Sequence, residues 1–279
     1  MLLELAIGDA YGAGFEYVSA SRVLRDNDLS RYVQHPRHRL VPGSYTDDTQ
    51  MSLAVAEAML SGESWTPALL ARHFVAAFRR DPREGYAQRF HAFLEEVQTG
   101  EEFLARIDPS SDKSGAAMRA PPLGVLPSTA QVVEWCTVQA EVTHRTTDGV
   151  NAAVAAALMA HYFAYDIGPK EELGPFLESE VPGQWAQPWL GEVGPKGWMS
   201  VRAAITAVVA HDTLADILRA CVAYGGDVDT VAAIALGAAS CSRDVTQNLP
   251  AHLADALENG AFGRDYIVAL DARLMALAG

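Results

Sequence analysis

The sequence predicts an all-α protein, and three observations support this. Of the 279 residues, 49% are hydrophobic, and much of that share is alanine, the residue with the highest helix propensity. Val, Ile and Thr rarely recur with the period of two that marks a half-buried strand. Helix-start signals and Gly or Pro breaks divide the chain into more than about ten helix-like segments.

The clearest amphipathic helix covers 51–59. Its apolar residues follow the spacing i, i+3, i+4, i+7 and i+8 that places side chains on one helix face: Met51, Ala54, Val55, Ala58 and Met59. We expect this helix to begin just after the acidic pair Asp47-Asp48.

Two further helices are predicted from their capping residues. Thr66-Pro67 is typical of an N-cap followed by proline at the first helical position, and Ser128 with Gln131 forms a capping-box pattern. Six other segments are helix-like between Gly, Pro or capping residues: 147–164, 199–210, 213–223, 230–242, 251–259 and 264–278.

The segment 165–198 departs from this helical pattern. It is rich in Gly and Pro, so we expect a long surface excursion containing at most a short helix. Its tryptophans are Trp185, Trp189 and Trp198, which either pack against the protein or line a ligand site. Packing is the simpler interpretation.

The length permits one domain, because a single hydrophobic core grows to roughly 250–300 residues. No internal repeat or low-complexity tract divides the chain. We therefore predict one domain over 1–279 that includes the excursion 165–198.

The net charge of −14 and the pI of about 4.9 disfavour general nucleic-acid binding, which needs a positive surface. The N-terminus lacks a signal-peptide pattern, and no apolar run reaches the roughly 20 residues that span a bilayer. Cys136, Cys221 and Cys241 form no CxxC pair and fit reduced thiols. These features predict a cytoplasmic protein without membrane segments.

The first motif with chemical potential is Tyr45-Thr46-Asp47-Asp48-Thr49, directly before the 51–59 helix. One acidic residue there would be an ordinary N-terminal acid favoured by the helix dipole. Two adjacent acids between two threonines exceed what capping requires. We expect their oxygens to point the same way because the backbone there is not yet helical.

The second motif is Gly225-Gly226-Asp227-Val228-Asp229-Thr230, before an apolar helix. The glycines let the chain turn, and we expect an extended Asp-x-Asp to place both carboxylates on one side. An apolar segment this continuous should be buried. Buried carboxylates are costly unless they are paired or bind a cation.

Both motifs together predict a metal centre. Asp47, Asp48, Asp227 and Asp229 carry a formal −4, which two divalent cations would neutralise. Carboxylate and hydroxyl oxygens suit Mg²⁺, Mn²⁺ or Ca²⁺, whereas no Cys or His stands at the spacing of a zinc site.

The sequence also resembles the ADP-ribosylglycohydrolases, which include the dinitrogenase reductase-activating glycohydrolase and the ADP-ribosylhydrolases. Five motifs in the order of that family carry the resemblance: Gly8-Asp9-Ala10 with Glu16, Thr46-Asp47-Asp48-Thr49, Ser114-Gly115-Ala116-Ala117-Met118-Arg119, Thr143-His144 and Gly226-Asp227-Val228-Asp229-Thr230. It implies an orthogonal helical bundle with a binuclear Mg²⁺ or Mn²⁺ centre in a central cleft.

The resemblance also implies roles for individual residues. The metal ligands would be Thr46, Asp47, Asp48, Asp227, Asp229 and Thr230. Glu16 would be catalytic together with Asp47 and Asp229, whereas an isolated Glu after two glycines would otherwise be taken as a surface acid. Substrate contacts would come from Ser114, Gly115, Ala116 and His144. The family usually has Asn where this chain has Ser114, and Arg119 is expected to be structural.

We therefore predict a hydrolase that uses two Mg²⁺ or Mn²⁺ ions to cleave the C1'' glycosidic bond of an ADP-ribosylated protein, nucleic acid or small molecule. The alternatives are a non-catalytic ADP-ribose-binding or structural protein on the same scaffold, and a hydrolase of another ADP-ribose-like small molecule. His211-Asp212 resembles the HD phosphohydrolases, but partner histidines at the required spacing are missing, and Asp212 is expected to cap the next helix.

Overall fold

Two apolar helices from opposite ends of the sequence form the centre of the protein. Every residue of α13 (Val228–Ala239) is buried, and so is most of α1 (Leu2–Gly12), which packs along it. The two backbones approach closely at Gly12, where a Cβ atom would lie only 2.4 Å from the Cα of Asp229. A side chain at this position would force the two helices apart.

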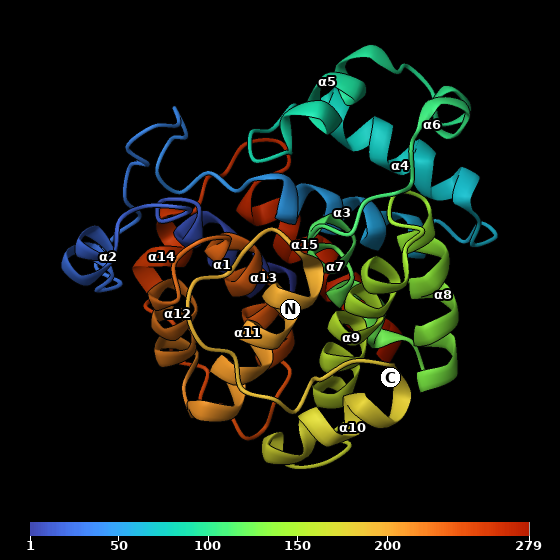
Figure 1. Cartoon of the computed structure of the whole chain (residues 1–279). Helices are drawn as coiled ribbons and strands as arrows, with labels where there is room; N and C mark the ends of the chain where they lie inside the picture. The colour runs from blue at the N-terminus through green and yellow to red at the C-terminus, as the bar shows by residue number, and fades with distance from the viewer. Residues whose placement is uncertain (279) are drawn as a thin grey trace.

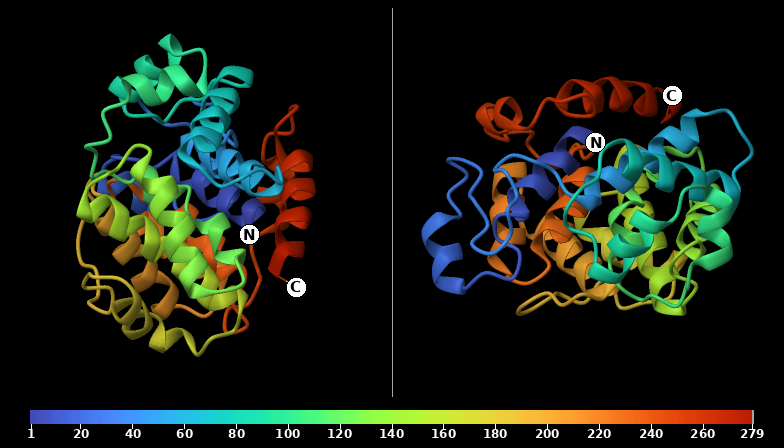
Figure 2. Two further views of the ribbon diagram at one scale, coloured as in Figure 1. Left: turned by 90° about the vertical axis from the view of Figure 1, so that its right-hand side faces the viewer. Right: turned by 90° about the horizontal axis from the view of Figure 1, so that it is seen from above.

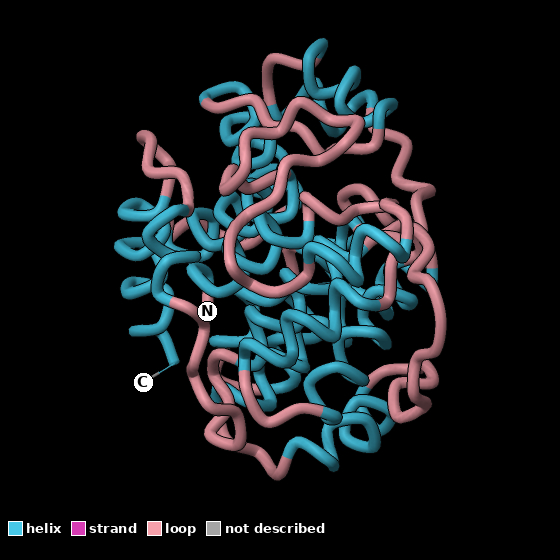
Figure 3. Tube along the Cα trace, turned by 90° about the vertical axis from the view of Figure 1, so that its left-hand side faces the viewer, coloured by secondary structure: helices cyan, strands magenta, loops and turns pink. Residues whose placement is uncertain are grey.

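The computed structural model describes residues 1–278 and is all-α, as the sequence predicts (Figure 1). No β-strand occurs in this range, and Figure 3 shows only helices and loops. The other elements are α2 (Ala20–Asp26), α3 (Asp47–Leu60), α4 (Pro67–Arg80), α5 (Gln88–Glu96), α6 (Gly100–Arg106), α7 (Gly115–Met118), η1 (Pro121–Val125), α8 (Thr129–Glu141), α9 (Thr147–Ala164), η2 (Lys170–Glu172), α10 (Leu173–Glu180), α11 (Gly197–Ala210), α12 (Leu214–Ala223), α14 (Ala251–Ala256), α15 (Arg264–Met275) and η3 (Ala276–Ala278).

The remaining helices surround this central pair. On one side α9 lies against α8, α11 and α13, and on the other α15 packs on α1 and α3 (Figures 1 and 2). Helices α4, α5 and α6 stand together at the top of Figure 1 and contact the rest through α3 and α8. The buried apolar side chains form one connected core. The division of the chain into domains stays a prediction.

Several local predictions are confirmed. Helix α9 spans 147–164 as expected. The Thr66 hydroxyl accepts a hydrogen bond from the N–H of Leu69, and the Ser128 hydroxyl accepts one from the N–H of Gln131, so both residues are N-caps. The expected cap at Asp212 is wrong. Thr213 caps α12, because the Asp212 carboxylate is paired with the ammonium group of Lys170.

The excursion 165–198 contains η2 and α10, followed by a loop that leads into α11. Trp185 and Trp189 are 2% and 9% exposed, and both indole N–H groups donate to backbone carbonyls of the same segment. Trp198 is partly buried and meets Trp189 edge to face. The tryptophans therefore pack the excursion against the core, as the simpler interpretation predicts.

Cys136, Cys221 and Cys241 are free thiols, as expected from their spacing. Among the described residues, no helix has both the length and the hydropathy required to cross a bilayer.

Candidate active site

The acids of the first motif lie in the first turn of α3. Thr46 is the N-cap, and the helix begins at Asp47, two residues earlier than predicted. The prediction failed because carboxylates are themselves favourable in a helix first turn, where backbone N–H groups have no intrahelical partner. Both carboxylates are buried nonetheless: Asp47 is 9% exposed and Asp48 is 2% exposed.

A carboxylate from another helix holds this motif in place. Asp9 on α1 is fully buried and accepts hydrogen bonds from the backbone N–H groups of Thr46 and Thr49, at 2.9 and 3.0 Å. The hydroxyl groups of both threonines also donate to it. Asp9, a residue of another helix, therefore accepts hydrogen bonds from backbone N–H groups at the start of α3. The hydroxyl oxygen of Thr46 donates its hydrogen to Asp9 and keeps its lone pairs for another partner.

The second motif also starts a helix. Gly225 and Gly226 have φ values of +75° and +85°, so the paired glycines make the predicted turn. Asp227 is the N-cap of α13, and Asp229 is already its second residue. The expected extended Asp-x-Asp is therefore wrong. At a helix start, both side chains still lie at the N-terminal end, where backbone N–H groups have no intrahelical partner.

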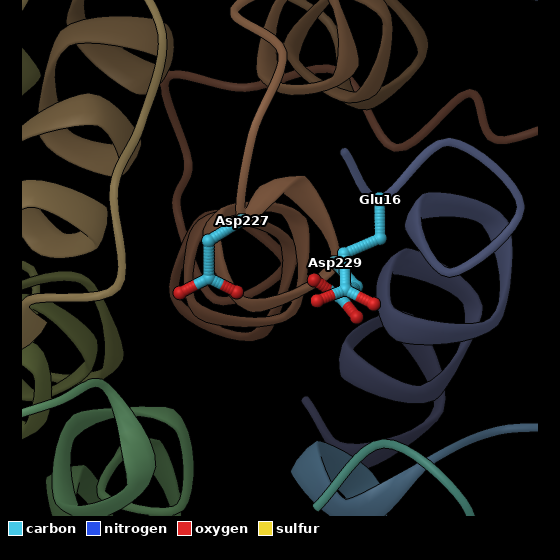
Figure 4. Close-up of side chains that lie close together, drawn as sticks. All are labelled: Glu16, Asp227 and Asp229. Atoms are coloured by element: carbon cyan, nitrogen blue, oxygen red, sulfur yellow. The ribbon is translucent and has the colours of Figure 1, made fainter. Parts of the chain in front are cut away.

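Glu16 brings a third carboxylate to these two. One carboxylate oxygen from each of Glu16, Asp227 and Asp229 lies within 4.8 Å of the other two, and Figure 4 shows the three groups pointing to the same side. Asp227 and Asp229 come from α13, whereas Glu16 comes from the turn that follows α1. Burial, and then the charge of Asp227, raises the pKa of Glu16 to about 7.

The acids of α3 share this site. Burial raises the pKa of Asp48 well above its ordinary value, and the charges of Asp9, Asp47 and Asp227 raise it further. The pKa of Asp47 is also raised well above its ordinary value, by burial and then by the charges of Asp9 and Glu16, among others. The two motifs, 180 residues apart from Asp47 to Asp227, are therefore brought together, as predicted from the sequence.

One buried oxygen shows that the site suits a cation. Asp48 Oδ1 is buried and has no hydrogen-bond partner among the described residues, although an unpaired buried carboxylate oxygen is costly. Burial and the charges of Glu16 and Asp48 also raise the pKa of Asp229. A divalent cation bound to these hard oxygen ligands would remove both costs.

The predicted substrate residues lie beside this cluster. Ser114 is the N-cap of α7. Burial raises the pKa of Asp227, and the Ser114 hydroxyl opposes this shift. The backbone N–H of Ser114 donates to Pro195 O at 3.1 Å and is not free for a substrate. Gly115 and Ala116 form the first turn of α7, where backbone N–H groups have no intrahelical partner. A Cβ atom on Gly115 would lie 3.1 Å from Cε1 of His144, which places His144 against the same segment.

Sequence reasoning missed the residues that position the acids. Asp9 belongs to one of the five motifs, but its contacts with the start of α3 were not predicted. An acid within an apolar helix could have indicated a buried carboxylate that needs hydrogen-bond donors. His35 is 3% exposed, and its Nε2 lies 2.9 Å from the carbonyl oxygen of Glu16. Ser200 donates to Asp227 at 3.4 Å. Nothing local in the sequence marks His35 or Ser200.

Fold and site together define an all-α protein in which two helix N-termini present buried carboxylates, and one turn a half-buried carboxylate, to a common centre. The chain belongs to the ADP-ribosylglycohydrolase family, whose sequence profile matches residues 1–279.

Curated relatives have names that fit this family. The chain is 27% identical over 253 residues to ADP-ribosylarginine hydrolase Tri1 of Pseudomonas putida, an alignment that covers 84% of this chain and 67% of that protein. It is 27% identical over 242 residues to the ADP-ribosyl-[dinitrogen reductase] glycohydrolase of Rhodospirillum rubrum, covering 84% and 81%. The match to ADP-ribosylhydrolase ARH3 of Xenopus tropicalis, at 26% over 171 residues, covers 58% of this chain and about half (48%) of that protein.

A solved structure described as an ADP-ribosylglycohydrolase-related protein complex has the same fold. It superposes with a TM-score of 0.77 at 24% sequence identity, over 100% of this chain and 96% of that one.

Proposed function

We propose that this protein is a metal-dependent hydrolase that removes ADP-ribose from a modified target by cleaving the C1'' glycosidic bond. The observation that carries the proposal is the unpartnered Oδ1 of Asp48, buried among carboxylates whose pKa values are raised. Family membership supplies the substrate class.

Six residues would hold two Mg²⁺ or Mn²⁺ ions: Thr46, Asp47, Asp48, Asp227, Asp229 and Thr230. All six are buried, and all offer the carboxylate or hydroxyl oxygens that hard cations prefer. When bound, such ions supply Lewis-acid chemistry, which lowers the pKa of a coordinated water or sugar hydroxyl.

The remaining residues would act on the substrate. A carboxyl with a pKa near 7 can take or give a proton at neutral pH, so Glu16 suits proton transfer with the attacking water or the leaving group. Asp47 and Asp229 would orient the reacting groups, so they count as catalytic as well as ligating. The ADP-ribosyl moiety would be bound by Gly115, Ala116 and His144. The Ser114 hydroxyl, which interacts with Asp227, would connect this segment to the acidic cluster.

The test is release of free ADP-ribose in the presence of Mg²⁺ or Mn²⁺. ADP-ribosylated arginine, serine, nucleic-acid and small-molecule substrates would be offered to the wild type first, and one that it hydrolyses would be used for the variants. Asp229→Asn should abolish turnover of that substrate. Asp265→Asn is the matched control, because Asp265 is also the second residue of a helix, α15, but is exposed.

Two outcomes would contradict the proposal. Tight binding of ADP-ribose by a wild-type protein that hydrolyses none of these substrates would indicate a non-catalytic binding protein. Equal activity of Asp229→Asn and Asp265→Asn would show that hydrolysis does not depend on the acidic cluster.

A further inference from the structure

Arg119 is a cation enclosed by the protein without an acidic partner. It is 1% exposed, and no ion pair among residues 1–278 includes it. Its Nε donates to the side-chain carbonyl of Gln139 at 2.8 Å, and its guanidinium lies 4.4 Å from the ring centre of Phe74. Burial lowers its pKa to about 10, so Arg119 remains charged at neutral pH.

The guanidinium of Arg119 also orients a hydroxyl group. Its Nη2 atom donates to Thr143 Oγ1 at 2.8 Å. Because arginine can only donate, the hydroxyl of Thr143 must accept this bond and keeps its own hydrogen for another partner. The partner within reach is Nδ1 of His144, 2.6 Å from the same oxygen.

This contact fixes the state of the His144 ring. If Thr143 donates to Nδ1, that nitrogen carries no hydrogen, and the neutral ring must carry it on Nε2. Protonation of both nitrogens is disfavoured, because burial and then the charge of Arg119 lower the pKa of His144 to about 3. The His144 ring is therefore neutral, and the contact with Thr143 favours an N–H at Nε2.

The Nε2 atom of His144 is buried and has no hydrogen-bond partner among the described residues. It faces Gly115, where an added Cβ atom would lie 3.4 Å away. A buried donor without an acceptor is costly, and such groups in native proteins usually mark a position that a ligand or water fills.

We infer that Arg119 and Thr143 are positioning residues, which hold His144 as an obligate Nε2–H donor to an acceptor oxygen of the bound ligand. The identity of that ligand as ADP-ribose rests on the proposed function. The acceptor is an oxygen of either the diphosphate or the distal ribose, because oxygens of both groups can accept a hydrogen bond from His144 Nε2–H.

The first test needs neither ligand nor activity. Long-range ¹H–¹⁵N correlation spectra of ¹⁵N-labelled protein distinguish the two neutral histidine tautomers, and His144→Gln identifies the His144 signals. We expect the Nε2–H tautomer at pH about 7 in the wild type and in Thr143→Ser. Thr143→Val should give a mixture of tautomers. Thr137→Val is the matched control, because the Thr137 hydroxyl donates to Val133 O at 2.7 Å instead.

The second test is calorimetric binding of ADP-ribose and of ADP to the same variants. Thr143→Val should bind ADP-ribose about tenfold more weakly than wild type, the factor expected for one lost buried hydrogen bond. The affinities of Thr143→Ser and Thr137→Val should stay within about twofold of wild type. An equal loss for ADP assigns the acceptor to the diphosphate. A loss confined to ADP-ribose assigns it to the distal ribose.

An Nδ1–H or doubly protonated His144 in the wild type would overturn the inference, and that spectrum decides it even if Thr143→Val does not fold. Unchanged ADP-ribose affinity in a folded Thr143→Val would overturn the ligand contact. Failure of the wild type to bind ADP-ribose would refute the proposed function and the ligand contact together. The spectra would still decide the tautomer independently.

Discussion

The hydroxyl of Thr46 donates to Oδ1 of Asp9 at 2.7 Å, and the backbone N–H of Thr46 donates to Oδ2 of the same carboxylate at 2.9 Å. One side chain of α1 thus does what an N-cap does for α3. The same helix packs along α13, which carries the second pair of acids. Helix α1 therefore sets the position of both acidic motifs relative to each other.

Asp9→Asn should weaken both stability and metal binding. An amide offers one acceptor oxygen where the carboxylate offers two, so at least one buried N–H or O–H of Thr46 or Thr49 loses its partner, at a cost of about 1–3 kcal/mol. Displacement of Thr46 should also lower Mn²⁺ affinity more than about tenfold in calorimetric titration.

Thr66→Ala is the control for Asp9→Asn, because it removes the N-cap of α4 and should cost about 1 kcal/mol. Its Mn²⁺ affinity should equal that of the wild type. If Asp9→Asn lost stability but bound Mn²⁺ as tightly as Thr66→Ala, Asp9 would be only a helix cap.

Gly85→Ala should damage the site more than its backbone strain explains. Gly85 has φ +103°, and a Cβ atom there would lie 2.1 Å from Oδ1 of Asp47. Gly62 has φ +73° with no atom within 4 Å of its Cβ position, so Gly62→Ala carries the backbone strain alone, about 1–2 kcal/mol. Only Gly85→Ala should lower kcat/KM for ADP-ribose release. Matching losses of activity in both variants would mean that Asp47 tolerates the displacement.

Metal-free protein should lose stability as the pH rises toward and above about 7. The pKa values of Asp47, Asp48 and Asp229 are raised well above their ordinary values and that of Glu16 to about 7, so the folded state holds protons that the unfolded chain has released. That stabilisation is complete below the unfolded pKa and is lost as the pH rises through the folded one.

Buried His144 has a lowered pKa and acts in the opposite direction, but only near and below its unfolded pKa of about 6.5. Melting temperatures measured with a chelator should therefore fall with pH in this window, and Mn²⁺ should restore them. Asp48→Asn should melt higher than wild type at pH about 8.5 without metal and gain less from Mn²⁺. A pH-independent melting temperature in the wild type would argue against buried, proton-holding carboxylates.

The sequence predicted what is encoded locally. The start of α9 and the caps at Thr66 and Ser128 follow from side chains within three or four residues of the helix start, so they could be predicted from the local sequence. The start of α3 was misplaced because an acid can stand either before a helix or within its first turn, and both positions are favourable.

Contacts between distant segments could not be predicted in this way. Asp212 is of a residue type that often caps helices, but in the folded chain its carboxylate pairs with the ammonium group of Lys170, 42 residues earlier. His35 reaches Glu16 only because a loop folds back across the end of α1. The convergence of the two acidic motifs was predicted from their charge and expected burial, because buried carboxylates are costly unless they are paired or bind a cation. The family resemblance implies the same convergence.

Anomalous scattering from Mn²⁺-soaked crystals tests whether the two acidic motifs bind metal at one shared centre. Peaks coordinated by Asp48 from α3 and by Asp227 or Asp229 from α13 are the predicted result, and Asp48→Asn crystals should show weaker ones. Crystals that diffract well at saturating Mn²⁺ but show no peak between the starts of α3 and α13 would contradict a shared metal centre.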